Sequence, residues 1–395
     1  MTSLPSALDF PAQRESPFRL DAYRALREGQ PVAPVTFVTG LPVWLVTGAA
    51  EVRAVLTDDR FTAVQSAPGY PQFGGGAAPG ALSFLGMDDP DHAYYRRLVA
   101  GEFTVRAVQR LRPLVEQAVE EAFAELTAGG PEGDLVSGYA LPVPSLVTCR
   151  QLGVPYADRA FFQGLISVLA EGTADLARLK QTALDLRAYF DGLATQKRGT
   201  PGDDLLSRLV GYEQAGQVDR EQLIGIALLL LIGGYETTAN MIALGVLALL
   251  THPEQLALLR TRPDLLDQAV EEVLRFVPLA EGGLARAATA DTDLGGVRIR
   301  AGEAVIVLPP AANRDPAQFV AGESFDIARP ARRHFTFGFG MHQCLGQHLA
   351  RLELRLAFEA LITRLPGLRL AVPMADLSFR YRGFIFGVEA LPVAW

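Results

Sequence analysis

The chain has very little cysteine and an excess of negative charge. Its two cysteines, Cys149 and Cys344, show neither the CxxC spacing of zinc sites nor the CxxCH spacing of covalent haem attachment. Two cysteines cannot form a disulfide framework, which fits a reducing cytoplasmic compartment. The 44 acidic side chains outnumber the 36 basic ones, and the resulting net charge of −8 argues against a nucleic-acid partner.

The sequence also lacks a recognisable leader. The stretch MTSLPSALDFPAQRESPF has no basic region followed by an apolar run, so we expect neither a signal peptide nor an anchor. Residues 224–250 are apolar and long enough to cross a bilayer. Glu236, Thr237 and Asn240 lie at their midpoint, where lipid would penalise a lone carboxylate. We therefore interpret this segment as a long helix through a soluble core.

Helical patterns dominate the rest of the chain. Residues 62–84 are rich in Gly, Pro and Ala without a period, which predicts a long loop that is functional or disordered. We expect helices at about 89–100, 104–128, 143–152, 158–170, 176–198, 203–213, 219–250, 253–260 and 263–276. Strand patterns gather near 32–48, 284–309 and 377–395. The sequence predicts a mainly α fold with a minor β portion, forming one domain over residues 1–395.

Two glycines, Gly233 and Gly234, stand in the middle of the long predicted helix, where each costs roughly 1 kcal/mol relative to alanine. Close packing of two helices would explain them, with Glu236 turned toward water. Alternatively, the Thr237 hydroxyl binds the carbonyl of Gly233 and helps to open a groove for a small ligand. A hydroxyl beside a carboxylate would then form a proton relay. The motif alone leaves both interpretations open.

A second pair of polar residues lies in the stretch AVEEVLRF. Glu272 and Arg275 are three residues apart on one predicted helical face, where they can pair. On the surface such a pair would contribute almost nothing to stability. The apolar neighbours Val273, Leu274 and Phe276 favour burial, and a buried pair would need further partners for both charged groups.

The stretch FTFGFGMHQCLG sets Phe337, Gly340, His342, Cys344 and Gly346 in the spacing F-x-x-G-x-H-x-C-x-G, ahead of an amphipathic helical pattern. A cysteine at a helix N-terminus has its thiolate stabilised by the helix dipole and by free backbone amides. The glycines let the loop lie flat. An inert buried cysteine is the alternative.

This stretch resembles the haem-ligand loop of the cytochrome P450 family, and the resemblance covers essentially the whole chain. It is closest to soluble bacterial members. It implies the cytochrome P450 fold, with haem b (iron protoporphyrin IX, bound non-covalently) between the long central helix and the helix after the cysteine. Cys344 would be the axial ligand of the haem iron, and Phe337, Gly338 and Gly346 would border the haem.

The resemblance implies roles for the other motifs. GGYETT is similar to the family's oxygen-groove motif, so Gly233 and Gly234 would adjoin the haem, and Glu236 and Thr237 would relay protons. Glu272 and Arg275 match the family's E-x-x-R, and Arg329 would complete a structural triad.

Haem propionates would be contacted by His92 and Arg96, on a helix that Asp89 caps and Pro90 begins, and by Arg286 and His342. We interpret His252, His334 and His348 as ordinary helix-end or surface residues.

The implied reaction is reductive activation of O2. No flavin or iron–sulfur motif accompanies the haem motifs, so NAD(P)H would supply electrons indirectly, through a ferredoxin and a ferredoxin reductase. Six arginines expected near the cysteine side of the haem could steer an acidic ferredoxin: Arg97, Arg106, Arg110, Arg112, Arg332 and Arg333. We expect the protein to be a monomer.

No motif encodes the substrate. By resemblance its pocket would draw on Phe73, Leu82, Leu229, Leu230, Leu279, Glu281, Leu284, Phe384 and Ile385. Most are apolar, with Glu281 and Glu171 as polar anchors, which suits an intermediate of secondary metabolism. We expect a monooxygenase that hydroxylates or epoxidises. Ring coupling, desaturation or peroxide-driven oxidation is the alternative. The third hypothesis is a non-catalytic haem sensor or carrier. The intact Glu236–Thr237 motif argues against it.

Overall fold

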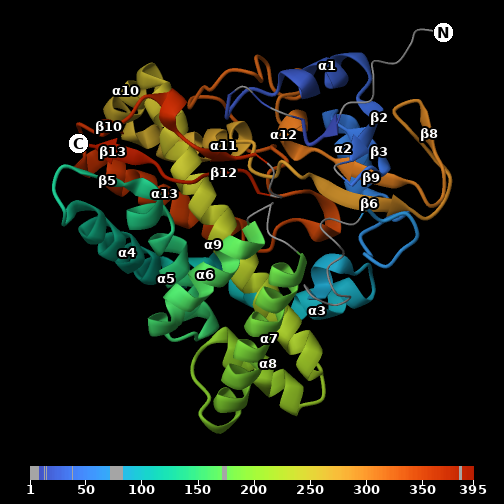
Figure 1. The fold of residues 1–395 in the computed structure, drawn as a ribbon, viewed down its shortest axis with the longest axis horizontal. Coiled ribbons are helices and arrows are strands. Elements are labelled where there is room, and N and C mark those ends of the chain that lie inside the picture. Colours follow the sequence, from blue (N-terminus) through green and yellow to red (C-terminus); the bar gives the residue numbers. More distant parts are fainter. Residues whose placement is uncertain are drawn as a thin grey trace.

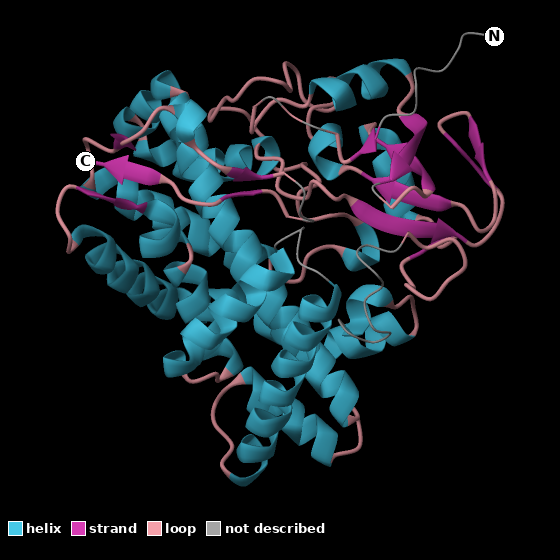
Figure 2. Ribbon diagram, in the orientation of Figure 1, coloured by secondary structure: helices cyan, strands magenta, loops and turns pink. Residues whose placement is uncertain are grey.

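The computed structural model describes residues 9–12, 14, 16–37, 39–71, 83–170, 176–381 and 385–395. Helices form most of the molecule, and the largest sheet lies at one side of it (Figure 1). Figure 2 shows the same division, with the strands concentrated on the right of the view and a smaller group near the C-terminus. The predicted mainly α fold with a minor β portion is confirmed.

The nine helices given predicted ranges agree with them to within about three residues. Side-chain caps begin α4, α8 and α9, and prolines begin α5 and α10. The helices of the described residues are α1 (Asp21–Gly29), α2 (Ala49–Thr57), α3 (Asp91–Ala100), α4 (Val105–Thr127), α5 (Pro142–Leu152), α6 (Arg159–Ala170), α7 (Leu176–Gly199), α8 (Leu205–Gln214), α9 (Arg220–Thr251), α10 (Pro253–Thr261), α11 (Leu266–Phe276), α12 (Pro309–Ala312) and α13 (Gln347–Arg364).

The larger sheet joins strands from both halves of the chain. Its order is β1 (Asp9–Phe10), β2 (Val32–Phe37), β3 (Pro42–Val46), β9 (Ala304–Val307), β6 (Leu284–Ala288) and β4 (Phe61–Thr62). Trp44 pairs with Val305 in parallel, and Arg286 pairs with Val305 from the antiparallel β6. The smaller sheets pair β10 (Arg369–Leu370) and β5 (Glu132–Asp134) with β13 (Pro392–Ala394), β11 (Phe379–Arg380) with β12 (Gly387–Val388), and β7 (Thr292–Leu294) with β8 (Val297–Ile299).

Helix α9 crosses the centre of the molecule (Figure 1) and packs against α5, α7, α11 and α13. Its start is fixed by Asp219, whose carboxylate accepts the backbone N–H of Gln222 at 2.7 Å. A Cβ at Gly245 would come within 2.6 Å of Phe358 Cζ and 2.7 Å of Val273 Cγ1, so three helices meet closely there. By length and composition α9 could span a bilayer, but 67% of its most apolar stretch is buried inside the molecule, as expected for a core helix.

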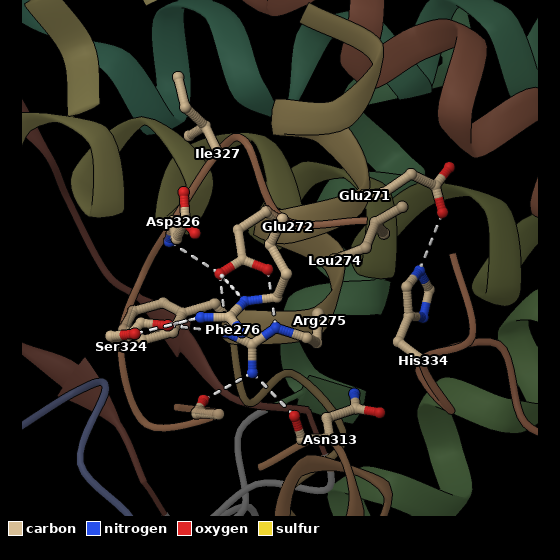
Figure 3. Close-up of polar contacts among 12 residues, drawn as sticks. Glu271, Glu272, Leu274, Arg275, Phe276, Asn313, Ser324, Asp326, Ile327 and His334 are labelled. Carbon is tan, nitrogen blue, oxygen red and sulfur yellow. Dashed lines mark hydrogen bonds and ion pairs between the residues drawn. The ribbon is translucent and has the colours of Figure 1, made fainter. Parts of the chain in front are cut away.

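The Glu272–Arg275 pair lies fully buried on α11 (Figure 3). The Arg275 guanidinium donates two hydrogen bonds of 2.7 Å to the two oxygens of Glu272. Its remaining N–H groups donate to the carbonyls of Asn313, Gly322 and Ser324, at 2.6 to 2.9 Å. Such additional partners allow an ion pair to remain inside a protein without an unsatisfied charge.

Arg329, at the end of the loop over residues 313–329, also contacts this pair. Its Nε lies 3.3 Å from Glu272 Oε1, which also accepts the backbone N–H of Asp326 at 2.9 Å. The rest of its guanidinium donates to the carbonyls of Val320 and Ala321. The three charged side chains therefore fix the loop over residues 313–329 against α11.

Removing one member of this pair should destabilise the fold. Glu272→Ala leaves the Arg275 charge buried with only carbonyl partners, so we expect a loss of about 3–5 kcal/mol in the free energy of unfolding by urea. Glu254→Ala, on the exposed face of α10, is the matched control and should change stability by less than about 0.5 kcal/mol. Equal stability of the two variants would contradict a structural role for the buried pair.

Candidate functional site

The loop before Cys344 depends on glycine at two positions. Gly338 and Gly340 adopt left-handed backbone angles, with φ of +68° and +72°. A Cβ at Gly340 would lie 2.3 Å from the backbone carbonyl oxygen of Leu56, so the loop can rest on the end of α2 only with glycine there. The Cys344 N–H then donates to the Phe337 carbonyl at 2.7 Å and closes the loop.

The Cys344 sulfur lies at the N-terminus of α13, as the sequence predicts. Burial raises the pKa of the Cys344 thiol, whereas the backbone N–H groups of Gly346 and Gln347 and the charges of Arg96 and Arg351 lower it. The net direction is upward, because desolvation outweighs the amides and the helix dipole on which the sequence argument relied. A metal ion bound to the sulfur would reverse this balance and hold the thiolate.

Cys344 is accessible to solvent although protein surrounds the sulfur closely enough to desolvate it. Both observations hold if the sulfur is surrounded by protein on most sides and open to solvent on one. A Cβ at Gly346 would meet no atom within 4 Å, so this side of the loop is also open.

The loop before Cys344 is also held by an ionic cluster around Glu271, which no sequence motif indicated. Glu271 accepts hydrogen bonds from His334 Nε2 at 3.2 Å and from Arg351 Nε at 2.6 Å. Burial alone would raise the pKa of Glu271, but these two partners lower it to about 2. The Arg351 guanidinium also stacks on the Phe337 ring at 4.5 Å. The prediction of His334 as a helix-end or surface residue is wrong, since the side chain is buried against α11 (Figure 3).

Asn313 and Thr336 tie the beginning of the loop to the same helix. The Asn313 carboxamide accepts the Phe335 N–H at 2.6 Å and donates to Thr336 Oγ1 at 3.0 Å. The Thr336 hydroxyl donates to the Leu274 carbonyl at 2.6 Å. No short motif indicated these contacts, which join residues 22 to 62 positions apart in the chain.

The four residues predicted to contact propionates lie together. The rings of His92 and His342 are 4.4 Å apart between centroids, and Arg96 Nη2 donates to the Gln343 carbonyl at 2.5 Å. Burial, with the positive charges of Arg286, His92 and Arg96, lowers the pKa of His342 to about 3. Arg286 is itself buried in β6, where burial lowers its pKa.

The helix that carries His92 and Arg96 begins one residue later than predicted. Pro90 follows a cis peptide bond and precedes α3, whose first residue is Asp91. The N-cap position is Pro90 and not Asp89 as predicted, although Asp89 Oδ1, one residue earlier, accepts the Ala93 N–H at 3.0 Å and lies 3.2 Å from His92 Nδ1.

The two central glycines of α9 have different surroundings. A Cβ at Gly234 would come 3.1 Å from Thr148 Oγ1 on α5, which is close helix packing. Gly233 is exposed and a Cβ there would meet nothing within 4 Å, although its neighbours along the helix are largely buried. The Thr237 hydroxyl donates to the Gly233 carbonyl at 2.6 Å beside this open space. Gly234 therefore serves close packing of two helices, whereas the surroundings of Gly233 are open.

Glu236 points away from water. The side chain is 8% exposed, and burial raises its pKa to about 7 despite the opposing effects of Arg380 and Asn240. An acid with this pKa holds and releases a proton in the neutral range. The interpretation in which Glu236 turns outward to solvent is therefore wrong.

Only part of the predicted substrate pocket can be placed. Phe73, Leu82, Glu171 and Phe384 lie outside the described residues. Leu229, Leu230, Leu284 and Ile385 are half-buried, and Leu279 is buried. Glu281, which we expected to anchor the substrate, forms an ion pair with Arg14, whose Nη2 lies 2.8 Å from Glu281 Oε2.

These residues fit haem. Among the described residues, His92 Nε2 and His342 Nε2 are buried without a hydrogen-bond partner, next to two arginines. Buried ring nitrogens without a partner, beside the guanidinium groups of Arg96 and Arg286, suit the two propionates of the macrocycle. The accessible sulfur at the start of α13 suits its iron.

Comparison with known proteins agrees with this geometry. The family model for cytochrome P450 matches residues 178–366. The chain is 45% identical to cytochrome P450-SOY of Streptomyces griseus, covering all of this chain and 96% of that protein. It is 43% identical to pentalenic acid synthase of Streptomyces avermitilis, covering all of this chain and 99% of that protein.

A solved structure is also similar over nearly its whole length. It is the mycinamicin VIII C21 methyl hydroxylase MycCI of Micromonospora griseorubida, bound to mycinamicin VIII, with a TM-score of 0.92 and 39% identity. The alignment covers 98% of this chain and all of that one. From the full-length identity and the shared fold, we conclude that the chain belongs to the cytochrome P450 family.

Proposed function

We propose that this cytochrome P450 monooxygenase hydroxylates or epoxidises an apolar intermediate of secondary metabolism in the cytoplasm. It would use O2 and two electrons that a ferredoxin delivers from NAD(P)H through a ferredoxin reductase. The observation that carries the proposal is the intact pair of Glu236 and Thr237 beside the open space at Gly233. A sensor or carrier has no need of a proton-transferring pair at that place.

When bound, haem supplies the iron centre at which O2 is reduced and cleaved. The chain supplies the ligand through Cys344 and a supply of protons through α9. Thr237 has its hydroxyl proton directed to the Gly233 carbonyl, so its oxygen is free to accept a hydrogen bond from a group in the open space. Glu236, with a pKa of about 7, can take protons from bulk water and pass them on at neutral pH.

The substrate class follows from the residues expected to line the pocket. The leucines at 229, 230, 279 and 284 and Ile385 give an apolar lining, which binds chiefly through the hydrophobic effect. The carboxylate of Glu281 is already paired with Arg14, so it does not offer a free charge to a cationic substrate. The similar proteins named for pentalenic acid and mycinamicin VIII support a natural-product substrate.

A groove near the cysteine loop supports the proposed electron donor. It has a volume of about 430 Å³ and lies between α4, α11 and the start of α13. Arg112, Arg332, His348, Arg351 and Arg355 line it together with the acidic Asp267 and Glu271 and the apolar Val105, Val108 and Leu352. Arg351 contacts the Phe337 ring of the cysteine loop, so a partner seated here would be close to the ligand loop. Glu271 pairs with Arg351 and Asp267 with Arg355, so among the lining residues Arg112 and Arg332 carry the positive charge that would attract an acidic ferredoxin.

Replacing Thr237 by alanine should separate electron use from product formation. In wild-type enzyme supplied with labelled O2, ferredoxin and reductase, we expect product that carries one labelled oxygen atom. Thr237→Ala lacks the hydroxyl at the groove, so NAD(P)H consumption should continue while product falls on the order of tenfold and hydrogen peroxide appears. Thr237→Ser keeps the hydroxyl and should stay close to wild type.

Two results would contradict this assignment. Unchanged coupling of electrons to product in Thr237→Ala would remove Thr237 from proton transfer. Wild-type product that has lost two hydrogens and gained no label would favour desaturation or ring coupling over oxygen insertion.

Charge reversal on α4 should slow reduction by the ferredoxin. For Arg110→Glu and Arg112→Glu we expect the rate of reduction at low ionic strength to fall on the order of tenfold, because a favourable field steers encounter. The difference should shrink at high salt. Arg298→Glu, on the exposed β8, is the control. Rates that respond neither to salt nor to either reversal would refute docking at this face.

A further inference from the structure

A single arginine, Arg380, links the C-terminal hairpin, formed by β11 and β12, to Glu236 on α9. Arg380, on β11, donates from Nη2 to Asn240 Oδ1 at 2.9 Å. The same Nη2 lies 3.7 Å from Glu236 Oε1, which is an ion pair but too long for a hydrogen bond. Asn240 in turn donates from Nδ2 to the Glu236 backbone carbonyl at 2.9 Å. Arg380 therefore contacts two α9 residues that are one helical turn apart.

The Glu236 carboxyl has few other partners. Its Oε1 is buried and has no hydrogen bond within the described part of the chain. Two elements packed near this turn present uncharged groups: α5 presents the Thr148 hydroxyl near Gly234, and β12 presents the backbone of Gly387. Of the groups that act on Glu236 there, Arg380 is the one that carries a charge.

The hairpin packs tightly against the hydrogen bond between Arg380 and Asn240. Arg380 and Gly387 face each other in the β11–β12 register. A Cβ at Gly387 would lie 2.2 Å from Asn240 Oδ1 and 2.5 Å from Arg380 Nη2. Only glycine leaves room for the Arg380–Asn240 hydrogen bond, so the backbone of β12 keeps the guanidinium in place.

The other side of the hairpin is held by aromatic stacking. Phe386 stacks on Phe379 and on Tyr381, with centroids 5.8 Å and 5.4 Å apart. The Arg14 guanidinium lies 4.2 Å from the Phe386 ring centroid and pairs with Glu281. These contacts hold the strands of the hairpin on either side of Arg380, so its backbone is fixed beside α9.

We propose that Arg380 is a positioning residue that sets the charge state of the Glu236 carboxyl, while Asn240 and Gly387 keep its guanidinium within reach. The proposal rests on the proposed function, in which Glu236 passes protons to the groove. It adds a control element outside the central helix. How closely the C-terminal hairpin packs on α9 would determine how readily the Glu236 carboxyl loses its proton.

The titration of Glu236 can be measured without turnover. Infrared spectra of the ferric protein from about pH 5 to about pH 9 report the protonated carboxyl band. Subtracting spectra of Glu236→Gln isolates this residue from Glu353, another buried acid whose pKa burial raises to about 8. An opposite charge this close lowers a carboxyl pKa by roughly 1–3 units. Arg380→Gln should therefore raise the midpoint by at least about one pH unit, a tenfold gain in proton affinity.

Matched variants separate charge from fold. Arg380→Lys keeps the charge and should shift the midpoint less than Arg380→Gln. Gly387→Ala displaces the guanidinium without removing it and should also raise the midpoint. Arg298→Gln, on the exposed β8, should leave it unchanged. If Arg380→Gln does not fold, Gly387→Ala carries the same test.

The proposal is overturned if the midpoint is the same in wild type, Arg380→Gln and Gly387→Ala, or if Glu236 shows no titration in any of them. A raised midpoint supports it. Any pH dependence of coupling that stems from Glu236 should then move upward by the same interval. A raised midpoint with coupling unaffected at every pH would refute the proton role of Glu236 while leaving the action of Arg380 intact.

Discussion

The site depends on the placement of one sulfur atom at the start of a helix. Cys344 stands two residues before Gly346, so backbone N–H groups of Gly346 and Gln347 reach its sulfur. Burial opposes ionisation of the thiol more strongly than these groups favour it. The chain therefore provides a site that prefers a cation on the sulfur, because a bound iron compensates the cost of a desolvated thiolate.

Most of the surrounding structure holds that sulfur in place. The buried pair of Glu272 and Arg275 fixes the loop that leads to the cysteine, and Glu271 holds both His334 and Arg351 at its base. Glu271 and Glu272 are adjacent in the middle of α11, so one helix organises two separate ionic clusters (Figure 3). Helix α9 supplies open space at Gly233 and the Glu236 carboxyl, whose pKa is about 7. Rigid supports thus surround the few atoms that carry the chemistry.

Local signals in the sequence predicted the longer helices and several contacts, whereas short strands such as β5 and β10 and contacts distant in the chain were out of reach. The bounds of α9 follow from Asp219 at one end and His252-Pro253 at the other. The three-residue spacing of Glu272 and Arg275 anticipated their contact, because helix geometry brings such residues together. Nothing local could indicate that Arg380 would reach Glu236 across 144 positions (380 − 236), or that Arg14 would occupy Glu281. Such pairs form only when the hairpin and the N-terminal segment fold back onto the core.

The central claim is that the Cys344 sulfur binds haem iron. The absorption spectrum of the purified, haem-loaded protein, reduced and exposed to carbon monoxide, tests this directly, because the Soret band of the carbonyl complex reports the ligand opposite carbon monoxide. The account predicts the long-wavelength band of thiolate ligation in wild type and its loss in Cys344→Ala. A protein that binds no haem, or a wild-type spectrum typical of a neutral nitrogen ligand, would contradict it.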